Sequence, residues 1–199
     1  MDIRERKPDD GFGRSMLLSS KWRVFPPLGS YGKKALRYKM TAPTLFEYRE
    51  VVGPDIIEEL TILASHVGNR SIRMVNSTAV GGGVAEMLLR IVPLLNEMGI
   101  QTTWSVVEGD DEFFEITKRF HNALQGQEDH FQKEVLETYL ACNEKNHNRL
   151  CFDEDLIVVH DPQPAALIQW HKKRKNRWVW RCHIDLSHPN QGLREFLKP

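Results

Sequence analysis

Three consecutive glycines are the first feature of the sequence that could do chemistry. Gly81, Gly82 and Gly83 stand between a short apolar segment at residues 71–75 and an amphipathic segment that runs to Gly99. A strand that leads through a glycine turn into a helix offers backbone N–H groups to phosphate or sugar oxygens. The turn is either such a ligand loop or a tight strand-to-helix connection. Its spacing differs from G-x-G-x-x-G, which argues against a nicotinamide cofactor.

Polar and titratable side chains gather where three further strands are expected to end. They are Glu108 and Gly109 after residues 100–107, His160 and Asp161 after residues 155–159, and His183 and Asp185 within residues 178–185. Ligands of open α/β sheets bind outside the carboxyl ends of the strands, so the sequence predicts a cleft there. His183 and Asp185 alternate along their expected strand and would share a face, as an acid–base pair or a sugar clamp. A packed, hydrogen-bonded pair is the alternative.

The other candidate side chains also have plain structural interpretations. Asp161 precedes Pro162, and this order predicts that Asp161 caps a helix. His160 ends an apolar strand, where a histidine can be a hydrogen-bonded structural residue. His121 and Asn122 lie near the end of an expected helix and could cap it or reach the cleft. Only the convergence of these residues on one edge favours a site.

Strand-like and helix-like segments alternate along the chain. The expected strands are 71–75, 100–107, 155–160 and 178–185, and the expected helices are 54–66, 83–98, 112–124, 131–147, 164–170 and one that begins at Pro189. This alternation predicts an α/β fold with an open parallel, Rossmann-like sheet that carries helices on both faces. Residues 45–199 form the domain, and residues 1–44 are expected to be an N-terminal extension, poorly structured or docked.

The expected sheet looks unfinished, because a doubly wound domain normally has at least one strand more. The chain is therefore expected to be part of something longer. An uncovered strand edge or apolar face also predicts self-association, for instance as a homodimer.

Composition excludes several classes of function. The 27 basic and 27 acidic residues balance, so no overall field favours nucleic acid or an anionic membrane. No apolar run approaches the ~18 residues of a membrane span, and the N-terminus has no signal-peptide core. The three cysteines form no C-x-x-C pair, so neither a disulfide framework nor a metal site is indicated. The basic run at residues 172–177 is expected to be a solvated helix end. These observations predict a cytoplasmic protein.

Four segments taken together resemble one family. They are Val75-Asn-Ser-Thr-Ala-Val-Gly-Gly-Gly-Val-Ala-Glu-Met87, Phe120-His-Asn-Ala-Leu-Gln-Gly126, Val159-His-Asp-Pro-Gln-Pro-Ala-Ala-Leu167 and Trp180-Arg-Cys-His-Ile-Asp-Leu-Ser187. Their order and spacing resemble the N-terminal half of the trehalose glycosyltransferring synthases, which are retaining glycosyltransferases of the two-domain GT-B type. The resemblance covers about residues 45–197.

The resemblance implies an enzyme that transfers glucose from a nucleotide diphosphate-glucose (UDP- or ADP-glucose) to free glucose, giving trehalose. This half would bind the acceptor, while the nucleotide sugar would be held mainly by a C-terminal donor domain that this sequence lacks. No cofactor would be bound permanently, and whether Mg²⁺ assists is left open. The chain alone is expected to be inactive. The alternative is a non-catalytic sugar-binding or subunit-interaction module derived from such an enzyme.

The resemblance also assigns roles to individual residues. Gly81, Gly82 and Gly83 would face the donor diphosphate, and His183 and Asp185 would be catalytic residues on the sugar side of the cleft. The remaining substrate-binding candidates are Glu86, His121, Asn122, His160, Asp161, Gln163 and Arg181.

Overall fold

The computed structural model of the chain describes residues 43–171 and 175–198. The extension expected over residues 1–44 therefore lies outside the described residues, apart from Pro43 and Thr44. Residues 172–174 of the basic run lie outside them as well, and Arg177, the last residue of that run, begins a strand rather than ending a helix.

Four parallel strands form one sheet in the order β2-β1-β3-β4. They are β1 (Ile72–Asn76), β2 (Thr102–Val106), β3 (Leu156–His160) and β4 (Arg177–Arg181). The open parallel α/β sheet is thus confirmed. The fourth strand is shorter than expected, because pairing with β3 ends at His160 opposite Arg181. His183 and Asp185 consequently lie on the segment after the strand, and the expectation that they share a strand face is wrong.

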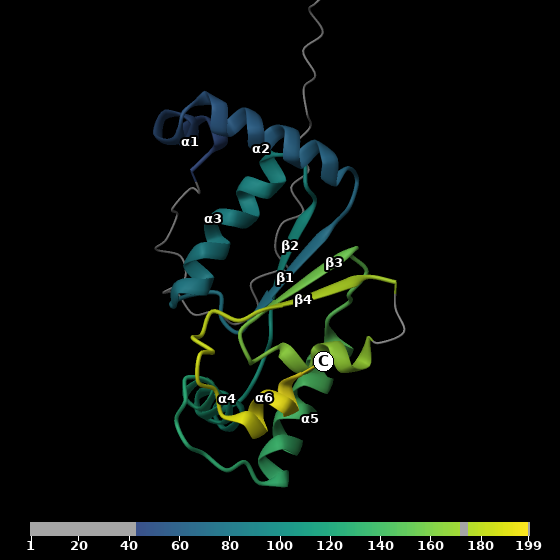
Figure 1. The fold of residues 1–199 in the computed structure, drawn as a ribbon. Helices are drawn as coiled ribbons and strands as arrows, with labels where there is room; N and C mark the ends of the chain where they lie inside the picture. The colour runs from purple at the N-terminus through teal and green to yellow at the C-terminus, as the bar shows by residue number, and fades with distance from the viewer. Residues whose placement is uncertain (1–42, 172–174, 199) are drawn as a thin grey trace, which may run out of the picture. The chain divides into compact units, whose positions relative to one another are not determined.

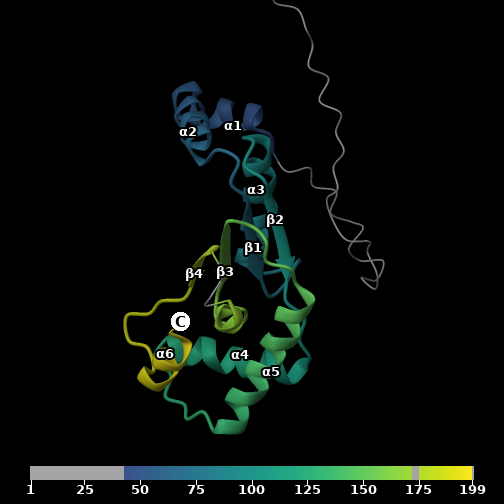
Figure 2. The same ribbon diagram turned by 90° about the vertical axis from the view of Figure 1, so that its right-hand side faces the viewer.

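Helices lie on both sides of this sheet (Figures 1 and 2). They are α1 (Leu45–Val52), α2 (Pro54–Val67), α3 (Gly83–Glu97), α4 (Asp111–Leu124), α5 (Lys133–Arg149), the 3-10 helix η2 (Ala165–Trp170) and α6 (Gln191–Leu197). In both views α1, α2 and α3 gather on one side, and α4, α5 and α6 on the other. Helix α1 is not among the helices predicted from the sequence, although Thr44 and Glu47 form a capping box at its start.

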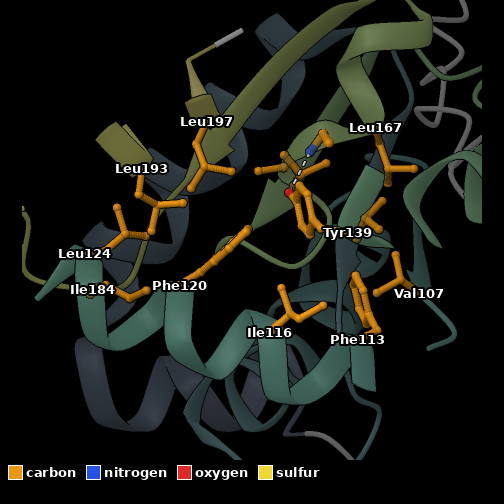
Figure 3. Close-up of a cluster of buried hydrophobic side chains, with 14 of the residues drawn as sticks. Val107, Phe113, Ile116, Phe120, Leu124, Tyr139, Leu167, Ile184, Leu193 and Leu197 are labelled. Carbon is orange, nitrogen blue, oxygen red and sulfur yellow. Dashed lines mark hydrogen bonds between the residues drawn. The ribbon is translucent and has the colours of Figure 1, made fainter. Parts of the chain in front are cut away.

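The hydrophobic core lies between the sheet and the group formed by α4, α5 and α6. Val75, Ile157 and Val159 of the strands are buried there against Phe120 of α4 and Tyr139 of α5. Figure 3 shows how the labelled side chains of these helices meet around the Tyr139 ring. The residues near the carboxyl ends of β1 and β3 are therefore packed against this core.

The side of α1, α2 and α3 is less covered. On α2 the apolar side chains of Ile56 and Leu63 are both exposed, and Ala64 is the one buried residue of that helix. No helix among the described residues is both long and apolar enough to cross a membrane.

Candidate functional site

The parallel pairing of β1 with β3 creates the point where ligands are expected. Val75 pairs with Val159, so the last residues of the two strands, Asn76 and His160, end side by side. The chain leaves β1 through α3 toward β2, whereas it leaves β3 through η2 toward β4, which lies on the other side. Adjacent strands whose connections leave in opposite directions leave a crevice at their carboxyl ends. The predicted edge is therefore the topological switch point of the sheet.

The glycine turn forms one wall of this switch point. Gly81 and Gly82 adopt φ values of 74° and 83°, which favour glycine, and Gly82 is the N-cap of α3. A glycine offers no side-chain cap, so the first N–H groups of α3 are left for water or a ligand. A Cβ built on Gly81, Gly82 or Gly83 would meet nothing within 4 Å. The three glycines are exposed and uncrowded on the side of a Cβ, and Glu86 is exposed in the first turn of α3.

Two histidines form a pair at the end of β3. Nδ1 of His160 lies 2.9 Å from Nε2 of His183, and the two rings stack at a centroid distance of 5.2 Å. His160 is only 1% exposed. Burial, the neighbouring His183 and then Arg181 lower the pKa of His160 from 6.5 to about 4. His160 is therefore neutral at physiological pH, and its buried Nε2 has no hydrogen-bond partner among the described residues.

Asp161 links the ends of β3 and β4 instead of capping a helix. Its φ is 64°, and its backbone N–H donates to the carbonyl oxygen of Arg181 over 3.0 Å. Its Oδ1 accepts from the N–H of His183 at 2.8 Å, while its carbonyl oxygen accepts from Nε1 of Trp180 at 2.9 Å. The N-cap prediction is wrong, because η2 begins later, after Pro164. What Asp161 does is fix His183 beside His160.

A stripe of polar side chains on α5 supports the loop after β3 from beneath. The buried Tyr139 hydroxyl donates to the carbonyl oxygen of Pro162 at 2.7 Å and accepts from the N–H of Ala166 at 3.1 Å. Burial raises the pKa of the Tyr139 phenol, which keeps it neutral and able to donate. One turn further along α5, Asn143 donates from Nδ2 to the carbonyl oxygen of Gln163 at 3.1 Å. Two helix residues thus hold the backbone after β3 at Pro162, Gln163 and Ala166.

The same stripe reaches the loop after β2. Asn146 accepts from the N–H of Glu108 at 2.8 Å and donates to its carbonyl oxygen at 2.6 Å. Tyr139, Asn143 and Asn146 are all buried and recur at helical spacing. The sequence pattern predicts a helix over residues 131–147 but not these buried polar contacts. Asparagines that continue an apolar helix stripe are a signal that could have been used, since buried amides demand hydrogen-bond partners.

Two amide oxygens near this loop are buried without a partner among the described residues. They are Oε1 of Gln163 and Oδ1 of Asn143. A buried polar atom without a hydrogen bond costs stability, and such atoms often await water or a ligand. Gln163, a predicted sugar contact, therefore carries an acceptor that no other described residue uses.

The remaining candidates occupy more open positions. Arg181 is the exposed last residue of β4. Oδ1 of Asp185 accepts from the Ser187 N–H at 2.9 Å and from the Ser187 hydroxyl at 2.6 Å. His183 and Asp185 thus have separate partners, so the acid–base pair expected between them is not formed in the ligand-free chain.

His121 and Asn122 lie on the last turn of α4, where both are half-buried. Their carbonyl oxygens accept hydrogen bonds from the N–H of Gln125, so these two carbonyl groups at the C-terminal end of α4 have backbone partners. Next to them, the carbonyl oxygen of Ala123 accepts from the N–H of Asn190, which ties α4 to the segment after β4. Their contact with a ligand stays a prediction.

Within residues 43–171 and 175–198, no group of three or more His, Cys, Asp or Glu side chains could hold a metal ion. The groups described at this edge are amides, backbone N–H groups, two histidines and exposed charges.

Comparison with known proteins decides the family. Residues 74–199 match the profile of a family described as "Trehalose synthase, N-terminal domain". The chain belongs to the trehalose synthase family. The resemblance stated from the four segments is thereby confirmed, and with it a relationship to glycosyl-transferring enzymes of trehalose.

Individual relatives agree with this assignment. A trehalose synthase of Pyrococcus horikoshii is 47% identical over 156 residues, which cover 77% of this chain and 37% of that protein. A trehalose synthase of Thermococcus litoralis is 45% identical over 156 residues, covering 77% of this chain and 38% of its own length. A trehalose phosphorylase of Pleurotus pulmonarius is 28% identical over 157 residues, which cover 71% of this chain and 21% of that protein. The chain thus spans less than two fifths of the length of the trehalose synthases that it matches.

We expect Tyr139→Phe to destabilise the chain by about 1–3 kcal/mol, because the Pro162 carbonyl and the Ala166 N–H lose a buried partner. Chemical denaturation measures the change. Tyr48→Phe is the matched control, since the Tyr48 hydroxyl makes no hydrogen bond to another described residue and should cost little. Equal stability of the two variants would contradict the supporting role of Tyr139.

The stability of the chain should fall as the pH drops from about 6.5 to 4. The unfolded chain protonates His160 near 6.5, while the folded chain resists until about 4, so the unfolded state takes up the proton first. Denaturation at a series of pH values should show a smaller loss in His160→Gln than in the parent. His66→Gln, a change at an exposed histidine of α2, should keep the parental slope. A parental slope in His160→Gln would refute this origin.

Proposed function

We propose that this chain is the acceptor-side domain of a retaining GT-B glycosyltransferase that transfers glucose from a nucleotide diphosphate-glucose to glucose, forming trehalose. The observation that carries the proposal is the switch point of the sheet. There the glycine turn after β1 and the loop His160–Gln163 after β3 lie at adjacent strand ends in a member of the trehalose synthase family.

The glycine turn suits the phosphate side of this reaction. The uncapped N-terminus of α3 and the exposed Gly81, Gly82 and Gly83 would let the donor diphosphate approach backbone N–H groups. Negative charge grows on the nucleotide diphosphate as it leaves, and preorganised N–H donors stabilise such charge. Glu86 lies just beyond the turn, where it would accept from a sugar hydroxyl.

The loop after β3 suits the sugar side. His160 and Gln163 carry buried polar atoms that have no partner within residues 43–171 and 175–198, and sugar hydroxyls both donate and accept hydrogen bonds. Asp161 already bonds to His183, so in this proposal it orients that histidine toward the ligand and contacts the acceptor with its second oxygen. Arg181 and Asp185 add charged groups at the rim, and His121 and Asn122 would complete the acceptor side.

In this proposal the nucleotide diphosphate-glucose is a substrate of the whole enzyme, and no cofactor is bound permanently. In this account the greater part of the relatives' length, which this chain does not span, holds the nucleotide. The isolated chain would then bind glucose or trehalose weakly and show no turnover.

Replacing Gln163 by methionine separates binding from folding. Its Oε1 has no partner in the described part of the chain, so an apolar side chain of similar length should leave the chain as stable as before or more stable. Loss of the amide should weaken glucose binding about fivefold to tenfold, as expected for one or two neutral hydrogen bonds. Calorimetric titration with glucose and thermal unfolding measure the two effects.

Gln101→Met, at the amino end of β2, is the matched control and should change neither glucose binding nor the unfolding temperature much. If the parent chain is folded and glucose does not bind it, the acceptor role is wrong. If Gln163→Met binds glucose as the parent does, Gln163 is not a sugar contact.

A further inference from the structure

Asn76 is the last residue of β1 and leads directly into the glycine turn. Its side chain is 2% exposed, and its amide makes hydrogen bonds at both ends. Oδ1 accepts from Nε1 of Trp104 on β2 at 2.8 Å, and Nδ2 donates to the carbonyl oxygen of Thr78 at 2.7 Å. One amide therefore connects the neighbouring strand to the first part of the turn.

Trp104 dictates how this amide is oriented. An indole N–H donates and never accepts, so the oxygen of the Asn76 amide must face Trp104. The NH₂ group then necessarily faces the opposite way, toward the Thr78 carbonyl. The orientation follows from the chemistry of the partner and has no equally satisfied alternative.

Thr78 passes this constraint on toward the glycines. Its Oγ1 donates to the carbonyl oxygen of Val80 at 2.7 Å and lies 3.2 Å from the Val80 N–H, which donates to it. Val80 and Gly81 are exposed, so packing does little to fix them. A series of hydrogen bonds from Trp104 through Asn76 and Thr78 thus holds the start of the glycine turn, where hydrophobic packing does not.

We infer that Asn76, oriented by Trp104, is a positioning residue that holds the glycine turn in its phosphate-binding shape before any ligand arrives. That the turn binds phosphate rests on the proposed function. That Asn76 holds the shape of the turn does not, because it can be tested without a ligand. Preorganised donors bind without paying the cost of ordering a loop. The sheet should not depend on the side chain, since the Asn76 carbonyl accepts from the Val107 N–H through backbone alone.

The test compares Asn76→Leu and Trp104→Phe with the parent chain. Neither change alters the net charge, so an effect on anion binding would not be electrostatic. Amide hydrogen exchange of Val80, whose N–H donates to Oγ1 of Thr78, should accelerate about tenfold in Asn76→Leu, as expected for one lost hydrogen bond. Trp104→Phe should accelerate it less, because Asn76 keeps its amide. The affinity for inorganic pyrophosphate should fall in the same order.

Asn96→Leu is the matched control. The Asn96 amide also bridges two segments, with Nδ2 donating to Val92 and Thr102 carbonyls and Oδ1 accepting from the Thr102 N–H, but it lies at the other end of α3. Its replacement should lower stability and leave exchange in the glycine turn unchanged.

The two readouts separate the two ideas. Parental exchange rates in the turns of Asn76→Leu and Trp104→Phe would overturn the positioning role. Faster exchange in a chain whose parent does not bind pyrophosphate would support positioning and count against the phosphate role of the turn. Should Asn76→Leu fail to fold, Trp104→Phe decides the positioning role by itself.

Discussion

The hydrogen-bonded pairing of β1 with β3 is the constraint on which the rest of the structure depends. It joins residues 72–75 to residues 156–159 across more than 80 positions of sequence, and it brings the two loops of the switch point together. Parallel pairing puts both carboxyl ends at the same edge, and the order β2-β1-β3-β4 sends the two connections apart. Without this pairing, the glycine turn and the His160 loop would be unrelated surface segments.

Buried polar contacts then give the edge its shape. Below the sheet, the amide and phenol groups of α5 hold the backbone after β2 and β3. On the side of α3, Asn76 connects the glycine turn to Trp104, and the His160–His183 contact closes the edge toward β4. These bonds lie in low dielectric, where satisfied polar networks are rigid and broken ones are costly. Hydrogen bonds therefore hold the backbone of this edge, while the glycine turn and Arg181 are exposed.

The sequence predicts the four strands, the described helices other than α1, and the family, but not the contacts. The glycines between an apolar strand and an amphipathic helix were sufficient to predict the turn, because local periodicity and backbone freedom decide it. The left-handed conformation of Asp161 could not be predicted, since it depends on Arg181 and Trp180 twenty residues later. The early end of β4 likewise depends on where β3 stops. The partners of the α5 amides are loop carbonyls, which no sequence pattern marks.

The most direct test of this account is to follow the indole N–H resonances of the chain during titration with trehalose. Trp180 donates to the Asp161 carbonyl at the proposed site, whereas Trp178 packs on Phe152 near the start of β4, with ring centroids 5.1 Å apart. The account predicts a saturable shift of the Trp180 resonance while that of Trp178 stays in place. A folded chain in which neither resonance moves, or in which Trp178 moves and Trp180 does not, would contradict a sugar site at the switch point.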